Sequence, residues 1–143
     1  LVELTERDVL QDGDQHMAEH LHFKGVQLAI DDFGTGNTSL SWLEKLRPDV
    51  LKIDRSFTSS VGIDSVNATV TDIIIALANR LHIVTVAEGV ETLEQESYLR
   101  SHGVDVLQGF YYARPMPVEA FPAWLASREE SESEGEGESE TTE

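Results

Sequence analysis

The chain has 143 residues, 40% of them hydrophobic, with a formal net charge of −17 and no cysteine. This composition suits one ordinary globular domain without disulfides or thiolate metal sites, and its acidity argues against general binding to DNA or RNA backbones. No apolar run is long enough to span a bilayer and no signal-peptide pattern opens the chain, so we expect a cytoplasmic location, with any membrane anchor of a parent protein in other domains.

Short apolar segments alternate with helical patterns along the chain. The pattern predicts strands at residues 1–5, 26–31, 49–54, 83–89 and 104–110. It predicts helices at residues 14–24, 38–47, 66–82, 92–103 and 117–126. In the longest helix we expect a buried stripe of Val70, Ile73, Ile74, Leu77, Ala78 and Leu81. Strands that are each followed by a helix indicate a parallel sheet with crossover connections.

Residues 127–143 differ from the rest of the chain in composition. They hold eight glutamates, one arginine and no apolar residue. Such a segment cannot bury a core, and its like charges repel one another. We therefore expect residues 1–126 to form the folded domain and residues 127–143 to form an acidic disordered tail.

Two α/β architectures fit the alternation of strands and helices, a doubly wound sheet and a (β/α)8 barrel of the TIM type. Polar residues lie at or just beyond the ends of successive predicted strands: Glu3, Asp31 with Asp32, Lys52 with Asp54, Glu88, and Gln108. A barrel brings these strand ends to one rim, where active sites are built, whereas an open sheet spreads them along a line. We therefore predict the barrel, with only about the last five βα units present.

The predicted rim gathers four carboxylates, those of Glu3, Asp31, Asp32 and Glu88. Hard oxygen ligands of this kind suit Mg²⁺ or Mn²⁺, and a site for two such ions is the usual apparatus of phosphoester hydrolysis. Lys52 could stabilise developing charge, or orient or deprotonate the attacking water. Gln108 could hydrogen-bond a substrate or a bound water. The alternative for any one of these acids is a helix cap or a surface charge.

Five segments resemble, in order, the signature blocks of the EAL family, the phosphodiesterases that linearise cyclic di-GMP. The segments are "LVELTE", "LAIDDFGTG", "LKIDRSF", "TVAEGVET" and "LQGFYYARPMP". The match runs from residue 1 to about residue 125. The resemblance implies metal-dependent hydrolysis of cyclic di-GMP to linear pGpG in bacterial second-messenger signalling, carried out by a complete EAL domain.

The same resemblance implies a role for each site residue. Metal ligands are expected at Glu3, Asp31, Asp32 and Glu88, and the cofactor is expected to be Mg²⁺ or Mn²⁺. Lys52 and Glu88 are the expected catalytic residues, and Gln108 is the expected substrate-binding residue. Glu6 and Glu91 are expected to support the loop "DFGTG" and the neighbouring ligands. Asn37 stands where the family usually has an aromatic residue.

The Glu-Ala-Leu block that names the family and the strand with a metal-binding asparagine do not occur in this sequence. We expect both upstream of Leu1, and we therefore expect this piece to be inactive alone. A module that binds cyclic di-GMP or a protein partner without turnover is the alternative function. The resemblance also implies a sensor or GGDEF domain in the parent protein. A homodimer could cover the open edges of the sheet.

Overall fold

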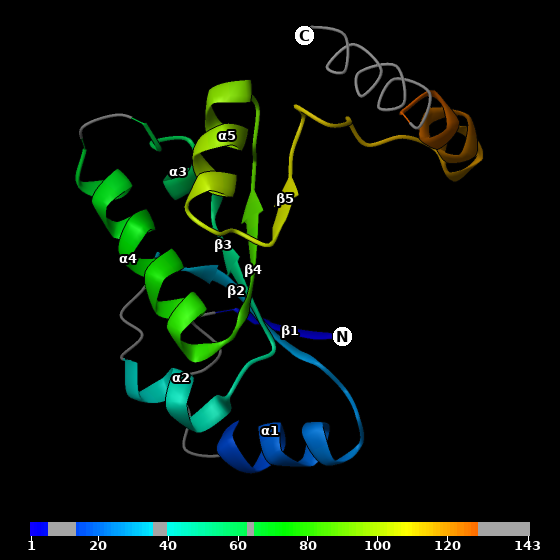
Figure 1. Cartoon of the computed structure of the whole chain (residues 1–143). Coiled ribbons are helices and arrows are strands. Elements are labelled where there is room, and N and C mark those ends of the chain that lie inside the picture. The colour runs from blue at the N-terminus through cyan, green and yellow to red at the C-terminus, as the bar shows by residue number, and fades with distance from the viewer. Residues whose placement is uncertain (6–13, 36–39, 63–64, 129–143) are drawn as a thin grey trace, which may run out of the picture. The chain divides into compact units, whose positions relative to one another are not determined.

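The computed structural model describes residues 1–5, 14–35, 40–62 and 65–128 (Figure 1). The chain divides into two compact units, Leu1–Ala113 and Arg114–Glu143. In the second unit, a short 3-10 helix η2 (Val118–Ala120) leads into a helix over residues 121–128, near the helix expected at residues 117–126. Residues 129–143, most of the expected disordered tail, lie outside the described residues. No helix in the described ranges is both long and apolar enough to cross a membrane.

The first unit holds five parallel strands that lie in the sheet in chain order. They are β1 (Val2–Thr5), β2 (Leu28–Phe33), β3 (Val50–Ile53), β4 (Val84–Glu88) and β5 (Val106–Gln108). The helices are α1 (Asp14–Phe23), α2 (Leu40–Leu46), α3 (Arg55–Thr58), α4 (Val66–Leu81) and α5 (Leu93–Ser101). The predicted α/β alternation and the parallel sheet are confirmed. The short helix α3 was not predicted, because four residues are too few to show a helical period.

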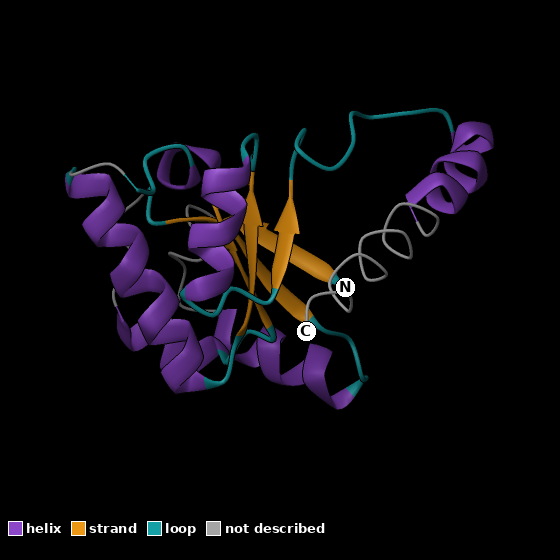
Figure 2. Ribbon diagram, turned by 45° about the horizontal axis from the view of Figure 1, so that its top comes forward, coloured by secondary structure: helices purple, strands orange, loops and turns teal. Residues whose placement is uncertain are grey.

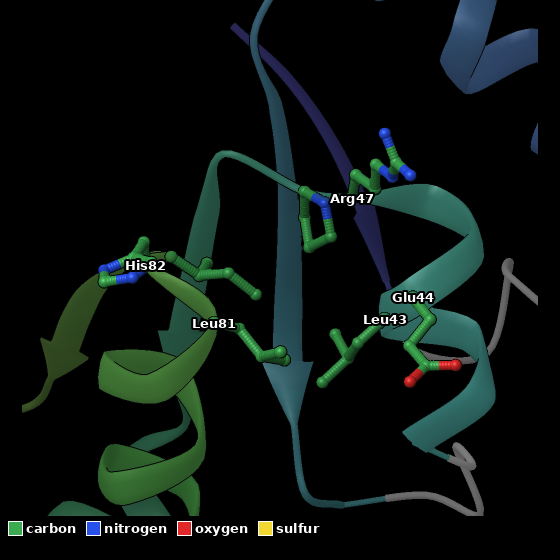
Figure 3. A pocket seen from close by; sticks show the side chains of 7 residues that line it. Leu43, Glu44, Arg47, Leu81 and His82 are labelled. Atoms are coloured by element: carbon green, nitrogen blue, oxygen red, sulfur yellow. The ribbon is translucent and has the colours of Figure 1, made fainter.

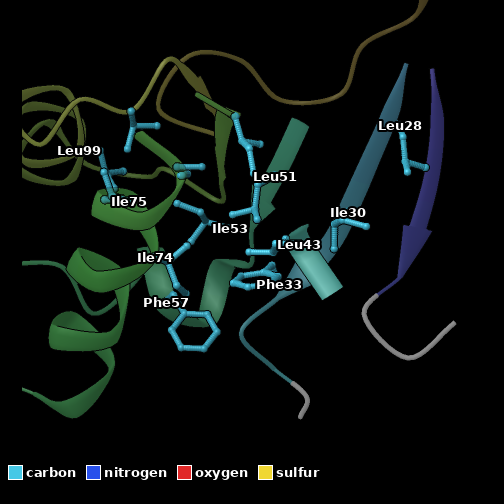
Figure 4. Packing of buried hydrophobic residues seen from close by; sticks show 14 of the residues in the cluster. Leu28, Ile30, Phe33, Leu43, Leu51, Ile53, Phe57, Ile74, Ile75 and Leu99 are labelled. Carbon is cyan, nitrogen blue, oxygen red and sulfur yellow. The ribbon is translucent and has the colours of Figure 1, made fainter. Parts of the chain in front are cut away.

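One face of the sheet packs against the helices of the first unit, α1 to α5, which gather on one side of it (Figure 2). Alternate strand residues are buried there and belong to one hydrophobic cluster: Leu28, Ile30, Leu51, Ile53 and Ala87. The helices contribute Leu43, Leu46, Ile74, Ile75, Ala78 and Leu99 to the same cluster (Figure 4). Burial of this continuous apolar layer is the main source of the unit's stability.

The other face of the sheet carries the remaining strand residues. Their pairing in register joins Val50 to Val84, Lys52 to Val86, Val86 to Val106, and Glu88 to Gln108. Val84 is 43% exposed and Val106 is 47% exposed, although both are apolar. In a closed barrel this face lines the interior, and its residues at the carboxyl ends of the strands reach the active-site rim. The polar residues of interest lie at that end.

The predicted buried stripe of α4 is partly wrong. Ile73 is 61% exposed and Leu81 is 40% exposed. The buried residues of the helix are Ala68, Thr71, Ile74, Ile75 and Ala78. The Thr71 hydroxyl donates a hydrogen bond to the Asn67 carbonyl at 2.8 Å, which allows this polar side chain to be buried. The helix therefore packs on the core through a face that includes the smaller residues Ala68, Thr71 and Ala78, and not through Ile73 and Leu81.

Candidate functional site

A β-bulge at the end of β2 holds the two adjacent aspartates. Ile30 and Phe33 of β2 are three residues apart, but their partners in β3 are only two residues apart. The two residues between them, Asp31 and Asp32, therefore lie opposite Lys52. Asp32 has a φ of 55°, in the left-handed region that aspartate tolerates better than most residues. A bulge bends its strand and redirects side chains, so these two aspartates do not simply alternate between the two faces.

The ammonium group of Lys52 lies among three carboxylates that come from three different strands. Its Nζ atom is 2.8 Å from Glu88 Oε1, 3.0 Å from Asp31 Oδ1 and 3.5 Å from Glu3 Oε2. We call these four residues the Lys52 cluster. The side chain of Lys52 is 15% exposed, whereas that of Glu3 is 47% exposed. The structure thus brings together four of the predicted site residues from β1 to β4, with Glu88 at the carboxyl end of its strand.

The surroundings of Lys52 keep its side chain positively charged. Burial alone would lower the pKa of Lys52, but the hydrogen bonds and charges of Glu88 and Asp31 raise it by more. The pKa of Lys52 therefore lies above its usual value, and the group is an ammonium at neutral pH. In this arrangement Lys52 can donate hydrogen bonds and balance negative charge.

Asp31 and Asp32 have different contacts. Asp31 Oδ1 accepts a second hydrogen bond, 3.0 Å long, from the backbone N–H of Asp32. The Asp32 side chain is exposed, and no contact of its carboxylate with Lys52 is present among the described residues. The Asp32 carbonyl accepts hydrogen bonds from the Thr35 N–H at 3.3 Å and the Thr35 hydroxyl at 2.9 Å. The turn that follows β2 is fixed through the Asp32 backbone.

The donor atoms of the Lys52 cluster fit a hard divalent cation. Carboxylate oxygens are the ligands that Mg²⁺ and Mn²⁺ prefer, and the cluster offers no imidazole or thiolate for zinc. The carboxylates of Glu3, Asp31 and Glu88 already converge on one positive charge, that of Lys52. Across the described ranges, no three His, Asp or Glu side chains stand close enough together to share an ion. The chemistry of the donors fits a metal, and Lys52 stands between them in this structure.

The remaining predicted site residues lie near the cluster or outside the described residues. Gln108 pairs in register with Glu88; its side chain is exposed and its carbonyl accepts the Val90 N–H at 3.0 Å. Glu91 forms an ion pair with Arg55 at 2.7 Å. Glu6 and Asn37 lie outside the described residues, so any contact of Glu91 with the loop around Asn37 also lies outside them. The roles expected for these residues stay predictions.

Asp54, which follows β3, is a helix cap. Its Oδ1 atom accepts the Ser56 backbone N–H at 2.9 Å and so begins helix α3. Burial raises the pKa of the Asp54 carboxyl, but the hydrogen bonds from Ser56 and the Arg55 backbone lower it by more, so the net pKa lies below its usual value. This polar residue of the predicted rim therefore has a local structural task.

The structure adds a contact that sequence reasoning missed, the ion pair of Arg55 with Glu91. Arg55 is the first residue of α3, and Glu91 follows β4. No local signal in the sequence could have found this pair, because its members are 36 positions apart.

A pocket of about 600 Å³ lies away from the Lys52 cluster (Figure 3). It is lined by the ends of α2 and α4 and the residues that lead into β3 and β4: Leu43, Glu44, Arg47, Pro48, Leu81, His82 and Ile83. These residues precede the strands, whereas Lys52 and Glu88 lie at the carboxyl ends. The side chains of Glu44, Arg47 and His82 point in different directions in Figure 3. We therefore take the Lys52 cluster as the candidate site.

A parallel sheet of βα units with carboxylates and a lysine at its carboxyl end defines part of an α/β barrel with an acidic active site. The sequence model of the EAL domain family matches residues 1–115. The chain belongs to the EAL domain family.

The relatives include proteins that are named cyclic di-GMP phosphodiesterases. The chain is 65% identical over 129 residues to "Probable cyclic di-GMP phosphodiesterase PdeD" of Escherichia coli. This match covers 90% of this chain and 24% of PdeD. It is 42% identical over 128 residues to MucR of Pseudomonas aeruginosa, which is named a bifunctional diguanylate cyclase/cyclic di-GMP phosphodiesterase. This match covers 88% of this chain and 19% of MucR. The chain thus spans about a quarter of the length of PdeD and about a fifth of the length of MucR.

Solved structures of EAL proteins share the fold. The MucR phosphodiesterase in complex with cyclic di-GMP matches with a TM-score of 0.77 and 43% identity, over 83% of this chain and 49% of that chain. Klebsiella pneumoniae BlrP1, in a complex with manganese and cyclic di-GMP, matches with a TM-score of 0.72 and 36% identity, over 79% of this chain and 29% of that chain. The predicted fold, part of a TIM-type barrel, is confirmed.

Proposed function

We propose that this chain is the C-terminal part of a phosphodiesterase domain that hydrolyses cyclic di-GMP to linear pGpG with Mg²⁺ or Mn²⁺. The observation that carries the proposal is the Lys52 cluster, in which Glu3, Asp31 and Glu88 surround one ammonium group. The names of PdeD and MucR support the substrate, and the manganese complex of BlrP1 supports the metal. The acidic charge of the chain also calls for a cation wherever a phosphate ligand binds.

Glu3, Asp31, Asp32 and Glu88 would hold the metal, which when bound supplies positive charge and an acidified water for attack on phosphorus. Lys52 is held as an ammonium by Asp31 and Glu88, so it is suited to hydrogen-bond a phosphate oxygen and stabilise the charge that develops there. Glu88 orients the Lys52 side chain through the 2.8 Å contact. Gln108, beside Glu88 in the sheet, would offer the substrate a neutral hydrogen bond.

The proposal includes partners in the parent protein. A sensor or GGDEF domain in the same polypeptide is supported by the bifunctional relative MucR. A homodimer of this chain alone would cover the two open edges of its sheet, at β1 and β5. A monomeric mass of the folded protein in solution would argue against the homodimer.

The test is turnover of cyclic di-GMP by the full-length protein and by this chain, each with Mn²⁺ or Mg²⁺, followed by chromatography of the products. We expect linear pGpG from the full-length protein and none from this chain alone. Lys52→Ala should remove the activity. The control Arg80→Met, at an exposed position on α4, should keep it. Binding of cyclic di-GMP without any product from the full-length protein would favour the alternative, a receptor module.

A further inference from the structure

Two ion pairs join the segment of β3 and α3 to the segment that follows β4. Lys52 of β3 contacts Glu88 of β4 at 2.8 Å, and Arg55 contacts Glu91 at 2.7 Å. Arg55 lies three residues after Lys52, and Glu91 lies three residues after Glu88. The second pair therefore repeats the first along both segments, just beyond the candidate site.

The aliphatic stem of Arg55 lies directly on the backbone of Gly89, the residue that follows Glu88. A Cβ atom at position 89 would come within 2.4 Å of Arg55 Cγ and 2.8 Å of Arg55 Cβ. Gly89 also has a φ of 71°, which favours glycine. Arg55 thus touches the backbone next to Glu88 with its stem and reaches Glu91 with its guanidinium group. Two contacts from one side chain span the turn that leaves β4.

The far end of this turn makes further contacts besides the ion pair with Arg55. The Glu91 N–H donates to Gln95 Oε1 at 2.8 Å, and Thr92 and Gln95 form a capping box at the start of α5. Val90 is fully buried and its N–H donates to the Gln108 carbonyl at 3.0 Å. Because Glu91 is held by these contacts, its ion pair with Arg55 fixes the guanidinium group. The stem of Arg55 then stays in contact with Gly89.

We propose that Arg55 is a positioning residue, which holds the turn Gly89–Glu91 so that the Glu88 carboxylate stays against Lys52. This inference rests on the proposed phosphodiesterase function. The Arg55 and Glu91 side chains are 61% and 41% exposed, so their ion pair adds little to global stability. Its effect falls on the geometry of the site, where a displacement of about 1 Å can reduce a rate about a hundredfold.

The test compares Arg55→Met, which keeps an unbranched stem over Gly89 but removes the charge, with Arg55→Lys and with the control Arg80→Met, all in the full-length protein. We expect Arg55→Met to lower kcat about tenfold to a hundredfold with little change in KM, and Arg55→Lys to restore part of kcat. The exchanged pair, Arg55→Glu with Glu91→Arg, should recover more activity than Arg55→Glu alone. The thermal midpoint of Arg55→Met should stay close to that of Arg80→Met.

A second readout does not depend on catalysis. Amide hydrogen exchange at Val90 and Glu91, whose N–H groups are hydrogen-bonded, should become faster in Arg55→Met and stay unchanged in Arg80→Met. Faster exchange together with the fall in kcat supports the inference. Unchanged exchange overturns it, as does faster exchange with wild-type kcat. If the wild-type protein does not hydrolyse cyclic di-GMP but Arg55→Met still speeds this exchange, the proposed function fails while the hold of Arg55 on the turn is supported.

Discussion

Thr85 and Asp105 hydrogen-bond to each other reciprocally. The backbone N–H and the hydroxyl of Thr85 both donate to Asp105 Oδ2 at 2.8 Å, and Thr85 Oγ1 accepts the Asp105 N–H at 3.1 Å. Asp49 makes a similar bond, since its Oδ2 atom accepts the Leu28 N–H at 2.8 Å. In both cases an aspartate directly before one strand binds the start of the neighbouring strand. These bonds fix the register that brings the site residues together.

Loss of the Asp105 carboxylate should destabilise the fold. In Asp105→Ala the fully buried Thr85 hydroxyl and N–H lose their acceptor, which we expect to lower the free energy of unfolding by about 1–3 kcal/mol. Asp105→Asn keeps an acceptor oxygen and should cost less. Urea unfolding of the two variants measures the difference. Equal losses in both variants would show that the negative charge, and not the acceptor geometry, is what matters.

The stabilisation that Lys52 gives to the fold should decrease at alkaline pH. Its folded pKa is raised above its ordinary value of 10.5 by Glu88 and Asp31, which outweigh the opposing effect of burial. Its contribution is therefore complete below that ordinary value and is lost as the pH rises toward the folded pKa. The stability gap between the wild type and Lys52→Met, measured without metal by denaturant unfolding, should be constant from neutral pH to about pH 9 and shrink at about pH 11 and above. A gap that shrinks below about pH 9 would contradict the raised pKa.

A substitution at Asp32 can change metal affinity while leaving the stability of the fold nearly unchanged. Its φ of 55° suits glycine, so Asp32→Gly should change the free energy of unfolding by less than about 1 kcal/mol. If Asp32 is a metal ligand, the Mn²⁺ affinity of the full-length protein should fall by more than the roughly tenfold to hundredfold that loss of an outer partner costs. Calorimetric titration with Mn²⁺ measures this affinity. Unchanged binding would remove Asp32 from the ligand set, and Asp31→Asn serves as the comparison because Asp31 contacts Lys52.

Gly109 should not tolerate a side chain. A Cβ atom there would lie 2.0 Å from the Val90 carbonyl oxygen and 2.3 Å from the Val90 nitrogen. The Val90 backbone cannot easily move, because its N–H donates to Gln108 and its carbonyl accepts the Tyr111 N–H, both at 3.0 Å. We expect Gly109→Ala to cost about 2–3 kcal/mol.

The control for Gly109→Ala is Gly25→Ala. Gly25 has a φ of 70° and open space around it, so its substitution measures the backbone penalty alone, about 1 kcal/mol. Denaturant unfolding of both variants provides the comparison. Equal costs would mean that the close approach of Gly109 to Val90 relaxes without strain.

Much of the fold and of the cluster could be predicted, because the signals are local or follow from topology. The strands show as apolar runs, and parallel strands bring their carboxyl ends together, so Glu3, Asp31, Lys52 and Glu88 could be expected at one rim. The bulge around Asp32 could not be predicted, because it exists only in the pairing of β2 with β3. The buried face of α4 was misjudged at Ile73, since three consecutive isoleucines fit more than one face.

Because the five strands lie in the sheet in chain order, each strand finds its neighbour among the residues synthesised just before it. The Lys52 cluster would be assembled in the same order during synthesis. Glu3 and Asp31 would come together first, Lys52 would then add its positive charge, and Glu88 would join last. The growing cluster never carries more than two unbalanced negative charges, counting its three carboxylates and one ammonium. The sequence order of these residues therefore limits charge repulsion while the site is still being built.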